Sequence, residues 1–171
     1  MSPEVIFFSV IIAVVVAFVG YKLLAHLKGK ITLHLNKTSF RFGETLTGHF
    51  DLEAKKAIEG NELSVTLVAR EKIEKRDSEG KRRTRTHEVY RNEKRLEGAK
   101  VYQAGSKANF IFEFFLPKTG TSEFAASTLG QAMNMLGSLL TSERRTIEWH
   151  IEARLDAKGI DITDSQRIYV E

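Results

Sequence analysis

The chain has 171 residues, enough for one hydrophobic core, and carries a modest net charge of +4. It contains no cysteine, which excludes a disulfide framework and any cysteine-based zinc site. With two prolines and no long low-complexity stretch or internal repeat, extended disorder is also excluded over most of the chain.

The first 28 residues predict a membrane anchor. From Val5 to Tyr21 the chain has no charged, Asn, Gln or Pro residue, and the apolar run continues beyond Lys22 to Leu27. A helix of about 23 residues would be roughly 34 Å long, enough to cross a hydrocarbon core of about 30 Å. A cleaved signal peptide fits less well, because the segment lacks a basic n-region and a small-x-small cleavage site.

The charges flanking this segment predict its orientation. Lys22, Lys28 and Lys30 follow the apolar run, whereas Glu4 and the α-amino group precede it. Because the Lys/Arg excess marks the cytoplasmic side, the N-terminus should lie outside and the following domain in the cytoplasm. We therefore expect a single-pass protein of the cell membrane, with an anchor over residues 1–28 and one domain over 29–171.

The remaining chain alternates apolar and polar residues with period two, which is typical of strands with one buried face. The predicted strands cover residues 31–35, 46–52, 63–69, 84–95, 110–116, 147–155 and 166–170. Glycine-containing turns at 42–44, 77–81 and 156–159 separate several of them. The fold class predicted from this pattern is all-β, with two antiparallel sheets closing their apolar faces into a β-sandwich.

Three segments, in chain order, resemble arrestin-like domains. They are the Gly-Glu turn and strand of Phe40–Gly48, the strand of Phe110–Pro117 preceded by Ala104-Gly105, and the strand of Ile147–Asp156. The resemblance covers about residues 30 to 171 and implies an immunoglobulin-like β-sandwich that binds other proteins and catalyses nothing. Arrestins usually have two such lobes and are soluble, whereas this chain has the length of one lobe and a predicted anchor. No receptor-binding or phosphate-binding residue is carried over from the family.

The segment from Arg70 to Lys100 is the most charged part of the chain, with twelve Lys/Arg residues against seven Asp/Glu. A hairpin tip within it carries the basic residues Lys81, Arg82, Arg83 and Arg85. This tip is a candidate contact for anionic lipid headgroups or for an acidic protein partner. The alternative is a solvated hairpin whose charges prevent edge pairing. Nucleic acid is disfavoured, because Tyr90 is the only aromatic residue available for stacking.

The segment from Thr121 to Arg144 interrupts the strand pattern and predicts one short amphipathic helix. Its apolar residues recur at spacings of three to five, and they are Phe124, Leu129, Met133, Leu136 and Leu140. Two interpretations remain open for this insertion. The helix either caps an open end of the sandwich or docks its apolar face on a partner or on the bilayer.

No pattern in the chain indicates catalysis. The five histidines are scattered singly, with no His-x-x-x-His pair, and there is no nucleophile elbow or phosphate-binding glycine loop. Glu148 and Glu152 share a strand face but would lie about 13 Å apart, too far for a paired acid and base. We expect no enzyme activity, cofactor or metal.

The function expected from these features is that of a membrane-anchored, arrestin-like adaptor or scaffold. It would bind a membrane protein partner at the cytoplasmic surface. The alternative is an accessory structural subunit of a membrane protein complex, held there by its transmembrane helix.

Overall fold

The computed structural model describes residues 27–76, 81–136 and 144–171. The predicted membrane span therefore lies outside the described residues, except for Leu27, and its predicted orientation stays a prediction. Over the described part of the chain, none of the helices combines the length and the apolar character needed to cross a membrane.

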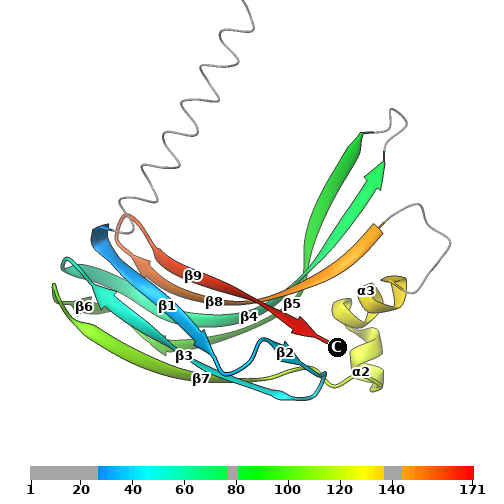
Figure 1. The fold of residues 1–171 in the computed structure, drawn as a ribbon, viewed down its shortest axis with the longest axis horizontal. Helices are drawn as coiled ribbons and strands as arrows, with labels where there is room; N and C mark the ends of the chain where they lie inside the picture. Colours follow the sequence, from blue (N-terminus) through cyan, green and yellow to red (C-terminus); the bar gives the residue numbers. More distant parts are fainter. Residues whose placement is uncertain (1–26, 77–80, 137–143) are drawn as a thin grey trace, which may run out of the picture.

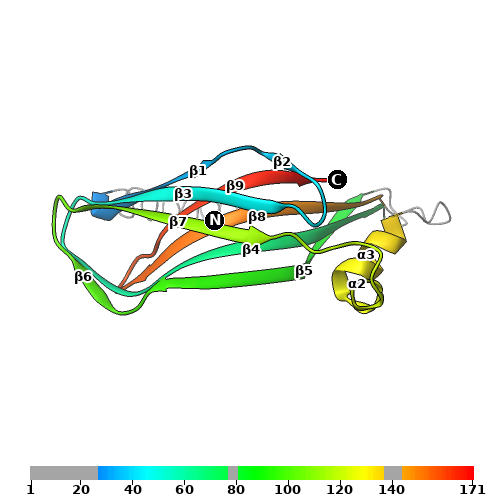
Figure 2. The ribbon, with the colours of Figure 1, turned by 90° about the horizontal axis from the view of Figure 1, so that it is seen from below.

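The described residues form two packed sheets, as predicted for a β-sandwich (Figures 1 and 2). The smaller sheet has the order β1-β3-β7, and its three strands pair antiparallel. These strands are β1 (Gly29–Leu35), β3 (Thr45–Ala54) and β7 (Lys107–Phe115).

The larger sheet has the order β2-β9-β8-β4-β5, and β6 pairs with the beginning of β4. Its strands are β2 (Ser39–Phe40), β4 (Ile58–Arg76), β5 (Arg82–Glu97), β6 (Lys100–Tyr102), β8 (Arg144–Ala157) and β9 (Ile162–Val170). The expectation of a purely antiparallel sandwich is wrong at one place, because β2 pairs with β9 in parallel. The alternation pattern missed β2 and β6, since two or three residues are too few to show a period.

The core lies between the two sheets and consists of the apolar faces that alternation predicted. Leu46, Phe50 and Leu52 of β3 are fully or almost fully buried, and they face Leu67 and Ile151 of the larger sheet within one continuous cluster. The two sheets are also joined by a polar contact, in which the Leu33 backbone N–H donates to Asp164 Oδ2 over 2.8 Å.

Simple alternation fails in β4, where residues on both faces are buried. Ser64, Thr66 and Val68 are at most 5% exposed although they point away from the core. Their neighbours across β5 and β8 are long charged side chains, with His150 beside Val68 as the exception, and these side chains cover them.

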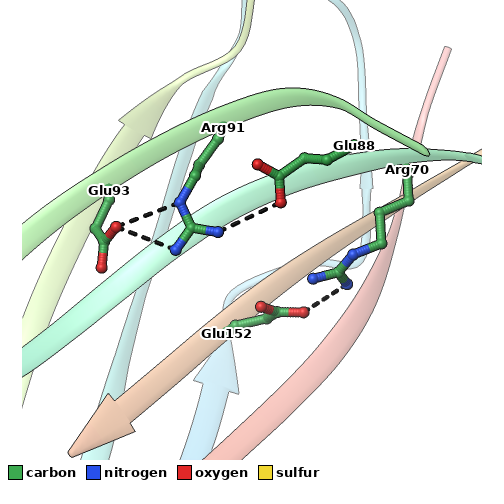
Figure 3. A network of polar contacts seen from close by, with 5 residues as sticks. All are labelled: Arg70, Glu88, Arg91, Glu93 and Glu152. Atoms are coloured by element: carbon green, nitrogen blue, oxygen red, sulfur yellow. Dashed lines mark hydrogen bonds and ion pairs between the residues drawn. The ribbon is translucent and has the colours of Figure 1, made fainter. Parts of the chain in front are cut away.

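Figure 3 shows the ion pairs of this cover. Arg70 Nη1 lies 2.6 Å from Glu152 Oε1, and Arg91 bridges Glu88 at 3.3 Å and Glu93 at 3.1 Å. Glu148 and Glu152, predicted to lie too far apart for a paired acid and base, are each paired with an arginine instead, and Glu148 lies 3.7 Å from Arg167.

The expectation of one helix in the insertion is also wrong. The structure has two, α2 (Ser122–Ala126) and α3 (Thr128–Leu136), separated by Ser127. The Ser127 hydroxyl donates to the Phe124 carbonyl at 2.6 Å and accepts from the Gly130 N–H at 3.0 Å. Ser127 thus provides a hydrogen-bond donor for a backbone carbonyl at the end of α2 and an acceptor for a backbone N–H at the start of α3. A continuous helix is therefore broken at this residue.

Candidate functional site

The hairpin of β4 and β5 extends well beyond the sandwich. β4 has 19 residues, a contour of about 60 Å at roughly 3.3 Å per residue. At Ala69 the pairing with β5 shifts by one residue, so that Val89 is an extra residue on β5. Such a bulge bends the strands that carry it. Figure 1 shows the hairpin rising away from the sandwich at the end that carries α2 and α3, whereas β1 begins at the opposite end.

Basic residues occupy both faces of this hairpin. Directly opposed residues share a face, and two consecutive cross-strand pairs are of like charge, Arg76 with Arg82 and Lys75 with Arg83. Like charges directly opposite each other destabilise a strand pair. The pairing of β4 with β5 is therefore less stable at this point than opposite charges would make it. Such an unfavourable arrangement is what a surface for an oppositely charged partner requires.

Among the residues that the structure describes, the acidic side chain of Glu74 lines a small depression of about 240 Å³ with Arg76, Arg82 and Arg144. A contact of 3.0 Å with Lys72 is the main cause that holds the pKa of Glu74 below its ordinary value, and the charges of Arg144 and Arg82 add to it. The ionised carboxylate of Glu74 is therefore favoured by the bases around it.

The predicted basic residues are brought together as expected. Lys81, Arg82, Arg83 and Arg85 are all exposed at the beginning of β5. The residues between the two strands, 77–80, lie outside the described residues. The structure adds Lys72, Lys75 and Arg76 from β4 and Arg144 from β8, which the sequence could not assign to this surface because pairing across strands decides their position. We call the set Lys72, Lys75, Arg76, Lys81, Arg82, Arg83, Arg85 and Arg144 the basic hairpin.

Docking on a partner or on the bilayer would need the apolar residues of the insertion to be exposed, but most of those that the structure describes pack against the core. Leu129 is only 1% exposed, and Phe124 and Met133 pack against the core cluster, with the Phe124 ring 6.0 Å from that of Phe42. Leu136 is 40% exposed, and Leu140 lies outside the described residues. This packing favours the capping interpretation, in which the helices close one end of the sandwich.

A buried ion pair joins β8 to β4 at the base of the hairpin, and its arginine also contacts the helical cap. Arg145 Nη1 lies 3.1 Å from Glu71 Oε1 and 3.2 Å from Met135 Sδ, and the Glu71 side chain is 8% exposed. Removing one partner of a buried pair leaves an uncompensated charge. The hairpin and α3 are therefore held together at this contact.

A second polar cluster lies on the outer face of the smaller sheet. His34 of β1 is directly opposite His49 of β3, and their rings are stacked with centroids 4.8 Å apart. His34 Nε2 lies 3.2 Å from Asp51 Oδ2, and the Asn109 amide of β7 donates to Asp51 Oδ1 over 2.8 Å. Asp51 and Asn109, with Thr32 and His34, line a depression of about 500 Å³.

The ionised form of Asp51 is favoured at this place. The hydrogen bond from Asn109 is the main cause that lowers the pKa of Asp51, and the charges of His34 and His49 act in the same direction. A negatively charged oxygen therefore lies next to two imidazole rings.

This cluster has no direct sign in the sequence, because its members come from three strands and a search along the chain finds them singly. The signal that could have found it is the pair His49-x-Asp51, which period two places on one strand face, together with a histidine on the neighbouring strand. The expectation that the histidines are scattered singly is thus wrong for His34 and His49, which the strand register brings together on the outer face.

We compared the chain with known proteins. No protein-family model matches it, and no curated protein matches its sequence. Among solved structures it is similar to Spo0M, the sporulation control protein from Bacillus subtilis, with a TM-score of 0.56 and 20% identity. The match covers 84% of this chain and 49% of Spo0M, so the chain spans about half the length of that protein. Spo0M has an arrestin-like fold, which supports the fold expected from the three motifs.

A weaker match is to the alkylpurine DNA glycosylase AlkC from Pseudomonas fluorescens, bound to DNA containing an abasic site analog. Its TM-score is 0.35 at 14% identity, and it covers 84% of this chain and 30% of AlkC. A TM-score and identity this low do not show a shared fold or function. The similarity to Spo0M, at 20% identity, shows the fold alone.

Proposed function

We propose that this protein is a membrane-anchored, non-catalytic adaptor, whose basic hairpin binds an acidic surface of a membrane protein at the cytoplasmic face. The observation that carries this proposal is the strand register, which places Arg76 opposite Arg82 and Lys75 opposite Arg83 on a hairpin that extends beyond the sandwich. A solvated hairpin needs no like charges directly opposite each other, because opposite charges at these positions would keep it soluble at lower electrostatic cost.

The predicted anchor and the ordered base of the hairpin also support binding. The anchor predicted over residues 5–27 would lead into β1, which begins at the end of the sandwich opposite to the hairpin (Figure 1). An anchor of this kind raises the local concentration of a partner in the same membrane. The ion pair of Arg145 with Glu71 braces the base of the hairpin, so a partner would meet a surface that is already ordered.

The test compares the full chain with a hairpin variant in which Lys81, Arg82, Arg83 and Arg85 are replaced by glutamine. A matched control removes the same number of charges from other exposed positions, by replacing Lys55, Lys56, Lys118 and Lys158. Surface substitutions change the free energy of unfolding by about 0.5 kcal/mol or less each, so circular dichroism should show both variants folded.

Affinity purification in mild detergent, followed by mass spectrometry, then reads out the partner. We expect one membrane protein to co-purify with the full chain and the control, and to be lost from the hairpin variant. The complex should also weaken with salt, because the Debye length falls from about 10 Å at 0.1 M to about 3 Å at 1 M.

Two outcomes would contradict the proposal. Equal recovery of the partner with the hairpin variant would show that another surface binds it. Co-purification of anionic phospholipid without any protein, lost in the same variant, would assign the basic hairpin to headgroups instead.

A further inference from the structure

We propose that His34, His49 and Asp51 form a binding site for a divalent transition metal ion, with Zn²⁺ as the best match. The site lies on the outer face of the smaller sheet and involves none of the residues of the basic hairpin. It is therefore independent of the proposed function, and each can be tested without the other.

The distances between the three side chains fit a metal site. One ligand atom from each residue lies within 4.8 Å of the other two. Tetrahedral Zn²⁺ with bonds of about 2.0–2.2 Å holds its ligand atoms roughly 3.4 Å apart. His34 and Asp51 are exposed, so small rotations about their side-chain bonds close the remaining gap without moving the strands.

The backbones of β1 and β3 already hold these three residues close together on one face. His34 and His49 are partners in the register of β1 with β3, and such partners have Cβ atoms about 5 Å apart. Asp51 follows His49 by two residues, so it shares the same face of β3. Because strands hold side chains more rigidly than loops, little entropy is lost when a metal binds.

The donor set selects the class of metal. Imidazole nitrogen suits Zn²⁺, Cu²⁺ and Ni²⁺, whereas Mg²⁺ and Ca²⁺ take oxygen ligands. Asn109 donates to the Asp51 oxygen at 2.8 Å that does not face His34, as the partners of metal-bound carboxylates do. Three protein ligands leave a fourth position for water.

The basic residues nearby do not oppose this assignment. Lys30 and Lys107 line the same depression, but Glu53 lies directly opposite both of them in the strand register. Lys107 Nζ is 3.4 Å from Glu53 Oε1. One of these two positive charges is therefore offset by Glu53. Among the described residues, neither lysine pairs with Asp51, whose carboxylate faces His34 and Asn109.

The experiment titrates Zn²⁺ into the full chain in mild detergent, after removal of any affinity tag and of bound metal with a chelator. Calorimetry should show saturable binding of one ion, and Co²⁺ in its place should give the visible absorption of a tetrahedral site. The double variant His34→Ala/His49→Ala should abolish both signals, and Asp51→Asn should weaken Zn²⁺ binding by about tenfold or more.

The matched control is His87→Ala, which removes an exposed histidine of β5 and should bind Zn²⁺ as the unchanged chain does. Because the substituted side chains lie on the outer face, circular dichroism should show each variant folded. Absence of saturable binding, or unchanged binding in the double variant, would overturn the proposal. Equally tight binding of Mg²⁺ would also overturn it, because imidazole ligands do not favour that ion.

Discussion

The turn before β3 shows what single residues contribute to this fold. Gly43 has a φ of +80°, a conformation that residues with a side chain rarely adopt, and its N–H donates to the Pro117 carbonyl at 3.0 Å. The next residue, Glu44, accepts from Lys37 Nζ at 2.7 Å and from the Arg41 N–H at 3.0 Å. The Gly-Glu pair thus closes the turn from which β3 begins, which gives the first arrestin-like motif a physical reason.

Gly48 in the same motif is required because a side chain would not fit there, and not because of its backbone conformation. A Cβ atom at this position would lie 2.7 Å from the His34 carbonyl oxygen and 2.8 Å from Phe112 Cζ. We predict that Gly48→Ala lowers the free energy of unfolding by about 1–3 kcal/mol, measured by chemical denaturation. Gly98→Ala is the control, because a Cβ there meets only the flexible end of Arg95. Equal stability of both variants would show that β1 and β7 can separate at Gly48.

Glu44 predicts a dependence of stability on pH. Its hydrogen bonds, first that from Lys37, hold the pKa of Glu44 below the ordinary value of 4.5. The folded chain therefore binds this proton less readily than the unfolded chain. The stabilisation is complete above the unfolded pKa and is lost as pH falls through the folded one.

The measurement is urea unfolding of the original chain and of Glu44→Gln from pH 7 to pH 3. The difference in unfolding free energy between them should be largest at pH 7 and should shrink toward zero below pH 4. A difference that stays constant over this range would show that the carboxylate charge plays no part.

At the scale of elements, α2 and α3 depend on how closely they approach each other. A Cβ atom on Gly130 would lie 1.9 Å from the Phe124 carbonyl oxygen, so the two helices cannot keep their places with any larger residue. This closeness also brings Leu129 and Ala132 of α3 into the core. The helical cap is thus a packed part of the fold.

We predict that Gly130→Ala releases the helical cap while the sandwich stays folded. Hydrogen exchange followed by mass spectrometry should show faster exchange over residues 122–136, with the amides of β3 and β8 unchanged. Asn134→Ala is the matched control, because Asn134 is exposed on the same helix. Slow exchange in Gly130→Ala would contradict the close approach of the two helices.

At the scale of the whole molecule, a chain of aromatic rings connects the parts. Trp149 in β8 is 3% exposed, and its ring lies 5.5 Å from that of Tyr90 and 6.1 Å from that of Phe42. Phe42 in turn contacts Phe124 of the helical cap. Trp149 therefore links the larger sheet, the turn before β3 and the cap.

We predict that Trp149→Ala costs about 3–5 kcal/mol of unfolding free energy, a large part of the roughly 5–15 kcal/mol typical of a domain. Thermal and chemical unfolding would measure this loss. Tyr169→Ala, at an aromatic residue that is 54% exposed, should cost far less. A Trp149 variant that melts as the original chain does would show that the cap and the turn pack independently of this ring.

The sequence by itself determined the fold class and most of the core. Period-two alternation identified the buried faces of β1, β3, β7, β8 and β9, because burial of one sheet face leaves a local pattern. The three arrestin-like motifs indicated the architecture that the similarity to Spo0M supports. The basic residues at the beginning of β5 were also evident, since they are adjacent in the chain. The anchor of residues 5–27 remains a prediction from hydropathy alone.

Only the tertiary structure decided the features that depend on pairing between distant segments. Strand register determines three of these features. It buries Val68 on the outer face, places Arg76 opposite Arg82, and places His34 opposite His49. Register is fixed by the packing of whole strands and by bulges such as that at Val89, which no local pattern encodes. The break at Ser127 has the same origin, because Leu129 is buried only when α3 turns away from α2 onto the core.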